Sequence, residues 1–255
     1  MAHSESISKN HPVIVIFGAY GGIGSCLARR LARTGARLVL AGHDPARLEA
    51  LALELNALPV SADATDFQQV TECFAKAREW GGRVDGAVNS VGSILLKPAH
   101  LTTIEEWNDT VLKNLTSAFA VVRGAVPVMR ENGGSIVLFG SAAGEVGMPG
   151  HEAIAAVKAG VAGLVRSAAA TYAPHGIRVN CIAPGLIDTP LAARITGNEQ
   201  SLRASVSMHP LGRIGTAEDV ASAAEWLLGS ASAWVTGQTL GVDGGLAKLK
   251  TRPKT

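Results

Sequence analysis

The sequence predicts an α/β fold, a doubly wound parallel sheet of about seven strands with helices on both faces. Short and continuously apolar runs such as Val13–Phe17 and Ser135–Phe139 are typical of strands buried on both sides. A longer segment with helical periodicity follows each run, and this alternation favours parallel strands joined by right-handed crossovers. No linker or change of composition divides the 255 residues. We therefore expect a single domain.

The elements follow in order from local signals. Glycine after the first helical pattern ends it near Thr34, and Asp44 before Pro45 provides an N-cap for the second helix. The stretch between the sixth strand and the helix from Ala217 is rich in loops. The expected strands cover 13–17, 37–41, 59–61, 84–89, 135–139, 177–182 and 238–242. The expected helices cover 22–34, 45–56, 67–80, 104–130, 154–172 and 217–228.

Composition excludes several classes of function. The content of 47% apolar and 17% charged residues suits a packed core, and a net charge of +2 gives no basis for binding nucleic acid. The chain has no run of about 18 apolar residues and no apolar segment near Met1, so we expect neither a membrane span nor a signal peptide. Three scattered cysteines indicate reduced thiols in a cytoplasmic protein without a metal site. Residues 1–11 and the basic segment 247–255 are expected to be flexible tails.

A glycine-rich turn joins the first strand to the first helix. It runs Gly18-Ala19-Tyr20-Gly21-Gly22-Ile23-Gly24. Glycines permit a tight turn and a close approach of the backbone to a pyrophosphate, and the helix N-terminus offers free N–H groups. The turn therefore predicts a dinucleotide phosphate site. A glycine-rich turn that holds no ligand is the alternative.

Further polar and glycine-containing segments follow the later strands or lie on the helices. Asn114 and Lys158 lie on the two long helices, and Ser141 follows the fifth strand. The other segments are Asp63-Ala64, Asn89-Ser90-Val91-Gly92 and Pro184-Gly185 with Thr189.

This ordered series resembles the short-chain dehydrogenase/reductase family over about residues 12–246, a family with a Rossmann-type fold. The resemblance implies that the glycine turn holds a nicotinamide cofactor and that Asn114, Ser141 and Lys158 belong to the catalytic centre. It also implies that Lys158 holds the nicotinamide ribose. The implied cofactor-binding residues are Gly18, Tyr20, Gly22, Ile23, Gly24, His43, Asp63, Ala64, Asn89, Gly92, Lys158, Pro184, Gly185 and Thr189. For Asp63, an Asx turn without a ligand is the alternative.

The end of the second strand bears on the choice between NAD and NADP. By comparison with the family, Gly42 occupies the position of an acid that would bind the ribose hydroxyls and repel a 2′-phosphate. His43 occupies a position that arginine often holds. The missing acid favours NADP over NAD, and NAD remains the alternative.

Ile154 occupies the position of the family's catalytic tyrosine. The spacing Tyr-x-x-x-Lys is kept to Lys158, but the segment is Ile154-Ala155-Ala156-Val157-Lys158. An isoleucine neither donates nor accepts a proton, whereas hydride transfer to a carbonyl requires a donor at the oxygen. His151, three residues earlier, is the nearest imidazole that could replace it. A histidine that only faces solvent is the alternative.

Two functions remain open. One is an NAD(P)-dependent oxidoreductase with an atypical site that reduces a carbonyl or a conjugated C=C bond of a small molecule. The other is a cofactor-binding pseudo-enzyme that serves as a binding or regulatory protein. In either case the family resemblance implies a homo-oligomer, a tetramer with two-fold axes, in which the two long helices pack against their symmetry mates. Residues 190–212 are expected to cover the substrate.

Overall fold

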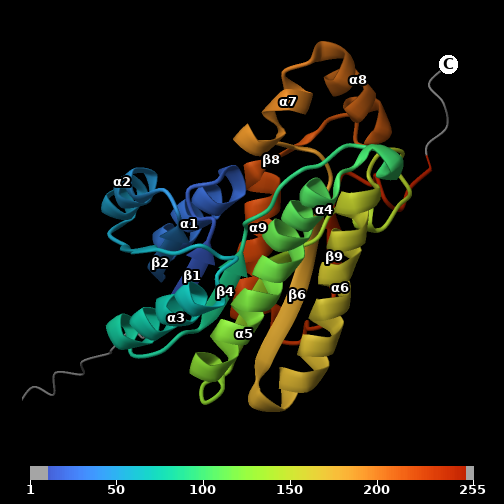
Figure 1. Ribbon diagram of the computed structural model, residues 1–255. Coiled ribbons are helices and arrows are strands. Elements are labelled where there is room, and N and C mark those ends of the chain that lie inside the picture. The colour runs from blue at the N-terminus through green and yellow to red at the C-terminus, as the bar shows by residue number, and fades with distance from the viewer. Residues whose placement is uncertain (1–10, 251–255) are drawn as a thin grey trace, which may run out of the picture.

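The computed structural model describes residues 11–250, so most of each expected tail lies outside the described residues. Seven parallel strands form one sheet in the order β3-β2-β1-β4-β5-β6-β9 (Figure 1). The change of direction lies between β1 (Val13–Phe17) and β4 (Gly86–Asn89). The predicted single-domain, doubly wound fold is confirmed. The remaining strands of this sheet are β2 (Arg37–Gly42), β3 (Leu58–Ser61), β5 (Gly134–Phe139), β6 (Ile177–Pro184) and β9 (Thr239–Val242).

Helices cover both faces of the sheet because each carries an apolar stripe. On one face, side chains of α1 (Gly22–Arg33), α2 (Pro45–Leu55) and α9 (Ala217–Leu228) join a buried cluster with alternate strand residues such as Ile16. On the other face, α3 (Phe67–Gly81), α5 (Ser117–Met129) and α6 (Glu152–Tyr172) pack over residues such as Phe17. The sheet is therefore buried on both sides, as its continuous apolar strands require.

The expected long helix from 104 to 130 has a break in its hydrogen-bond pattern. It consists of α4 (Ile104–Val111), one π-helical turn over Leu112–Thr116, and α5. Such single π turns inside α-helices are frequent at functional sites, because they rotate one side chain relative to its regular position. The side chain in the middle of this turn is Asn114.

The stretch after β6 is more regular than its composition indicates. It contains α7 (Ala193–Thr196) and α8 (Glu199–Met208), and the two-residue strands β7 (Ile187–Asp188) and β8 (Gly215–Thr216) pair with each other. In Figure 1, α7 and α8 stand above the carboxyl ends of the strands. They form a cap over the edge of the sheet where ligands bind in this architecture.

The segment Glu152–His175, which contains α6, is long and apolar enough to cross a membrane by composition alone. Its inner face packs against the sheet through Val161 and Val165, which are fully buried. Burial against the sheet explains this apolar face, as in the core helices of many globular domains. Part of its outer face is also apolar and remains accessible, for example at Leu164.

Candidate active site

The glycine turn has no room for side chains at its critical positions. Gly18 has a φ of +73°, a left-handed conformation that favours glycine. A Cβ on Gly24 would collide with the carbonyl oxygen of Gly18, and one on Gly22 would lie 2.7 Å from the Thr189 methyl. The turn thus leaves the first N–H groups of α1 facing the edge of the sheet, and it brings Thr189 beside them. This cradle fits the pyrophosphate of a dinucleotide.

Tyr20 fills the space at the end of β2. Its ring lies where a side chain on Gly42 would project, so a Cβ there would collide with the ring. The Tyr20 hydroxyl accepts the N–H of Asp44 and lies 3.2 Å from Nδ1 of His43. Arg47 stacks on the ring, with its guanidinium carbon 4.6 Å from the ring centre, and donates to the Tyr20 carbonyl. An acid at position 42 would therefore require the Tyr20 ring to move.

Two acidic residues, Asp44 and Asp63, follow β2 and β3 respectively. Asp44 is the N-cap of α2, since its carboxylate accepts the N–H of Arg47, and this prediction is confirmed. Asp63 forms an Asx turn in which Oδ1 accepts from both the N–H and the hydroxyl of Thr65. Ala64 is buried next to it. One of the two carboxylate oxygens of Asp63, Oδ1, is thus bonded within its own turn.

The side chains after β4 hold the site together. The Ser90 hydroxyl is 2.7 Å from the Phe17 carbonyl oxygen and 3.1 Å from that of Gly18, so it ties β4 to the glycine turn. Asn89 is buried and donates to the hydroxyl of Ser117 on α5. This hydrogen bond fixes the Asn89 side chain against α5.

The π turn directs Asn114 at the loop after β4. Its amide nitrogen donates to the Ser93 hydroxyl and to the Thr110 carbonyl, and its oxygen accepts the Ser93 N–H. The side chain is 1% exposed. A Cβ on Gly92 would lie 2.9 Å from the Asn114 oxygen and 3.5 Å from Nζ of Lys158. Asn114, Gly92 and Lys158 are therefore neighbours.

Ser141, Ile154 and Lys158 line one cavity of about 150 Å³ together with Gly92, Pro184, Gly185 and Thr189. Nζ of Lys158 donates to the Phe139 carbonyl at 3.0 Å. Burial lowers the pKa of Lys158 from 10.5 to about 8. The Ser141 hydroxyl oxygen accepts the Ala143 N–H, which leaves its own proton available to a ligand. Ile154 is 5% exposed and presents only hydrocarbon.

His151 lines a second cavity of about 170 Å³ that adjoins the first and shares Ser141 and Ile154 with it. Nδ1 of His151 lies 2.9 Å from the Pro149 carbonyl oxygen, which can only accept. Nδ1 therefore carries the proton and Nε2 is unprotonated in the neutral ring. Neutral His151 can accept a proton through Nε2. It can donate one from that atom only when the ring is charged.

Sequence reasoning missed three contributors to this region. No sequence motif marks Arg47. Its stacking on Tyr20 depends on tertiary packing, because it joins a turn to a helix. Ser93 follows a segment that was recognised, but its bonds to Asn114 need the π turn. His209 lies within the expected cover 190–212, where no sequence motif marks it, yet it is buried and accepts the N–H of Leu186. Within residues 11–250, no group of three His, Cys, Asp or Glu side chains gathers as a metal site.

We expect Lys158 to make the stability of the ligand-free protein depend on pH. Its folded pKa of about 8 lies below its unfolded value, so between about pH 8 and pH 10.5 the unfolded chain binds more protons and stability rises with pH. Lys158→Met removes this dependence. We compare the free energy of unfolding of Lys158→Met with that of wild type. The difference in favour of the variant should be about 2 kcal/mol larger at pH 7 than at pH 10. Urea titrations at both pH values measure it, with Lys113→Met on the exposed surface as the control. An equal advantage at both pH values would contradict the prediction.

The comparisons with known proteins agree with this geometry. Residues 18–247 match the family model described as enoyl-(acyl carrier protein) reductase. The chain is 36% identical to the 3-oxoacyl-(acyl-carrier-protein) reductase FabG of Thermotoga maritima, covering 92% of this chain and 97% of that one. It is 37% identical to a Xanthobacter autotrophicus protein named inactive 2-(S)-hydroxypropyl-CoM dehydrogenase 2, covering 88% and 100%.

A solved structure gives the same result. A short-chain type dehydrogenase/reductase from Mycobacterium ulcerans superposes with a TM-score of 0.88 and is 32% identical, covering 92% of this chain and 90% of that one. The sheet order, the glycine turn and the cavity between β4, β5 and β6 are thus accompanied by similarity over nearly the whole chain. The chain belongs to the short-chain dehydrogenase/reductase family of oxidoreductases.

Proposed function

We propose that the protein is an NAD(P)-dependent oxidoreductase that reduces a carbonyl or a conjugated C=C bond of a small molecule. The observation that carries this proposal is the convergence of Ser141, Lys158 and Gly92 on one cavity beside the glycine turn. The glycines fit the cofactor because added Cβ atoms would fill the cradle. When bound, the nicotinamide supplies hydride. The chain supplies binding, orientation and proton transfer.

Each polar residue of the cavity has a role that its contacts support. Lys158, held by the Phe139 carbonyl, presents its remaining N–H groups to the ribose side. Ser141 donates its hydroxyl proton to a substrate oxygen, because its oxygen already accepts the Ala143 N–H. Asn114 holds the loop of Gly92 and Ser93 against the cavity. Thr189 stands beside the glycine turn and suits a contact with the cofactor.

Ile154 determines how strongly the site can reduce a ketone. A hydrocarbon at this position leaves the developing oxyanion with the Ser141 hydroxyl as its donor, and loss of one positioned acid typically lowers the rate by about 10² to 10⁴-fold. Reduction of a conjugated C=C bond depends less on such a donor, because hydride adds to carbon. The description of the matching family model as an enoyl reductase supports this version.

A pseudo-enzyme is the second candidate. Ile154 supports it, and one relative carries the word inactive in its name. In this version the folded, cofactor-bound chain acts as a binding or regulatory protein. The preserved polar set of Asn114, Ser141 and Lys158 favours the oxidoreductase. We also propose a cytoplasmic setting, supported by three free cysteines of which Cys73 and Cys181 are fully buried.

For the cofactor we propose a preference for NADP. Packing of Tyr20 against Gly42 removes the acid that would repel a 2′-phosphate, and the exposed guanidinium of Arg47 lies on the same ring beside His43. Arginine is the usual ligand for such a phosphate, because its planar fork matches the oxygens. His43 adds a second donor at the same corner.

We expect NADP⁺ to bind more tightly than NAD⁺. Arg47→Ala should weaken NADP⁺ about tenfold, the effect of one charge-assisted hydrogen bond, and leave NAD⁺ nearly unchanged. His43→Asp should shift the preference toward NAD⁺. Fluorescence titration measures the dissociation constants. Arg78→Ala is the control for loss of an ion-paired arginine elsewhere, since Arg78 on α3 pairs with Glu131. Failure of both cofactors to bind at millimolar concentration would refute the cofactor assignment.

We propose a homotetramer with two-fold axes. Phe119, Val122, Val126 and Leu164 line a groove of about 300 Å³ between α5 and α6, on the outer side of the helices. At the edge of the sheet formed by β9, Leu240 is 37% exposed, and Trp234, in the segment that precedes β9, is fully exposed. Exposed apolar side chains such as Phe119, Trp234 and Leu240 suit contacts between copies of the chain.

Light scattering at micromolar concentration should therefore give about four times the chain mass of 26.2 kDa. Leu164→Glu places a charge in the groove and should reduce the assembly to smaller species. Leu53→Glu, on the exposed side of α2, is the control for an added charge. A monomeric wild type would contradict the proposal.

Ile154→Tyr tests the position of the missing donor. The variant should raise ketone reduction, because Lys158 and Ser141 already stand beside the new phenol. Overpacking limits the gain, since a ring must fit a cavity shaped by isoleucine. Initial rates with simple ketones and either cofactor measure it, and Ile154→Phe controls for size. Wild-type turnover of about 1–10³ per second, unchanged by the tyrosine, would refute this interpretation of Ile154.

A further inference from the structure

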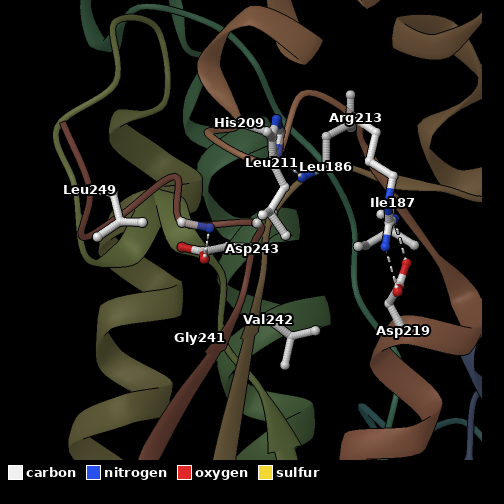
Figure 2. A pocket seen from close by; sticks show the side chains of 14 residues that line it. Leu186, Ile187, His209, Leu211, Arg213, Asp219, Gly241, Val242, Asp243 and Leu249 are labelled. Atoms are coloured by element: carbon white, nitrogen blue, oxygen red, sulfur yellow. Dashed lines mark hydrogen bonds and ion pairs between the residues drawn. The ribbon is translucent and has the colours of Figure 1, made fainter. Parts of the chain in front are cut away.

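His209 is the C-cap residue of α8 and lies in the wall between two cavities. It is 3% exposed. On one side lies the cavity of about 170 Å³ that contains Ile154 and His151. On the other side lies a cavity of about 360 Å³ that contains Asp243 (Figure 2). Gly185, Leu186 and His209 line both cavities, so these three residues form the partition.

Both ring nitrogens of His209 are engaged by the backbone. The N–H of Leu186 donates to Nε2 at 3.2 Å, and Nδ1 lies 2.7 Å from the carbonyl oxygen of Ser205. An amide N–H can only donate and a carbonyl oxygen can only accept. The ring is therefore neutral, with its proton on Nδ1. The Ser205 contact fixes the ring on α8, and the Leu186 contact connects α8 to the segment after β6.

The chain around the imidazole is shaped to receive it. A Cβ on Gly185 would lie 2.5 Å from Nε2 of His209 and 3.1 Å from the Cα of Asp243. Glycine is thus needed at 185 for the ring to reach the Leu186 N–H. Gly185 and Leu186 also line the cavity of Ser141 and Lys158. The position of this segment sets one wall of that cavity.

We propose that His209 is a positioning residue whose neutral imidazole ties α8 to Leu186 and so holds the Gly185–Leu186 wall in place. Protonation of Nε2 would turn this atom from an acceptor into a donor, and it would then face the Leu186 N–H, which is also a donor. The tie therefore requires an unprotonated Nε2, and it is broken when that atom takes up a proton. That this wall bounds a substrate pocket rests on the proposed function; the tie itself does not.

The charged groups around the partition have partners of their own. Asp243, at the end of β9, accepts the N–H groups of Gly245 and Ala247. Arg213, in the segment after α8, pairs with Asp219 of α9, as the dashed lines in Figure 2 show. His151, across the smaller cavity, is bonded to the Pro149 carbonyl. The His209 ring itself is hydrogen-bonded to the backbone of Leu186 and Ser205.

Hydrogen exchange of the Leu186 amide tests the proposal in the full chain without ligand. After correction for intrinsic rates, wild type should exchange this amide about tenfold faster at pH 5.5 than at pH 7.5, the equivalent of one hydrogen bond. In His209→Gln the side-chain oxygen can accept the same N–H without titrating, so protection should persist at both pH values. In His209→Phe exchange should be fast at both.

Amides of β6 serve as the internal reference for global unfolding, and His151→Gln is the matched control for a histidine on the same cavity. That control should keep the pH dependence of wild type. Equal protection of Leu186 at both pH values in wild type, or loss of the pH dependence in His151→Gln, would overturn the proposal. If His209→Phe does not fold, wild type and His209→Gln still decide.

The experiment separates this proposal from the proposed function. Exchange is measured without cofactor or substrate, so a chain that binds no nucleotide can still show the tie. If the protein is an active oxidoreductase, His209→Gln should flatten the acid limb of its pH–rate profile. Failure of the exchange test with normal cofactor binding would overturn only the role of His209.

Discussion

The absence of space at the carboxyl edge of the sheet is the constraint on which the site depends. The carbonyl oxygen of Gly18, the Ser90 hydroxyl and the backbone of Gly24 meet where β1, β4 and α1 converge. Only glycine fits there, so the backbone itself forms the surface that faces a ligand. Because parallel strands end together at this edge, each later loop is brought to the same point. The cavity that contains Lys158 and the partition at Gly185 lie along this same edge of the sheet.

The sequence predicted the fold well because each strand is buried on both faces. Continuous apolar runs such as Val13–Phe17 cannot stay in solvent, and the expected bounds of that strand and of α9 agree with the structure. The π turn at Leu112–Thr116 could not be predicted, since its i→i+5 hydrogen bonds shift the helical pattern by only one residue. Nor could α8, whose sequence is mixed and whose cap residue Asn198 lies in a stretch of polar residues.

The candidate site was predictable where function depends on the backbone or on fixed spacing. Glycines at 18, 22 and 24 and the interval from Ser141 to Lys158 are visible in a linear chain. Contacts between distant segments are not. The stacking of Arg47 on Tyr20 joins a turn to a helix 27 residues later, and the bond from Leu186 to His209 spans 23 residues. These contacts arise from how α2 and α8 settle on the sheet, which no local pattern encodes.

The packing of Tyr20 over Gly42 also restricts the mutational routes open to this protein. An acid at 42 collides with the ring, and a small residue at 20 alone removes the support of Arg47 without providing an acid. A lineage that places an acid at position 42 would need both changes, because neither single substitution provides an acid that fits. Positions 20 and 42 are therefore coupled, because an acid at 42 fits only when the side chain at 20 changes as well.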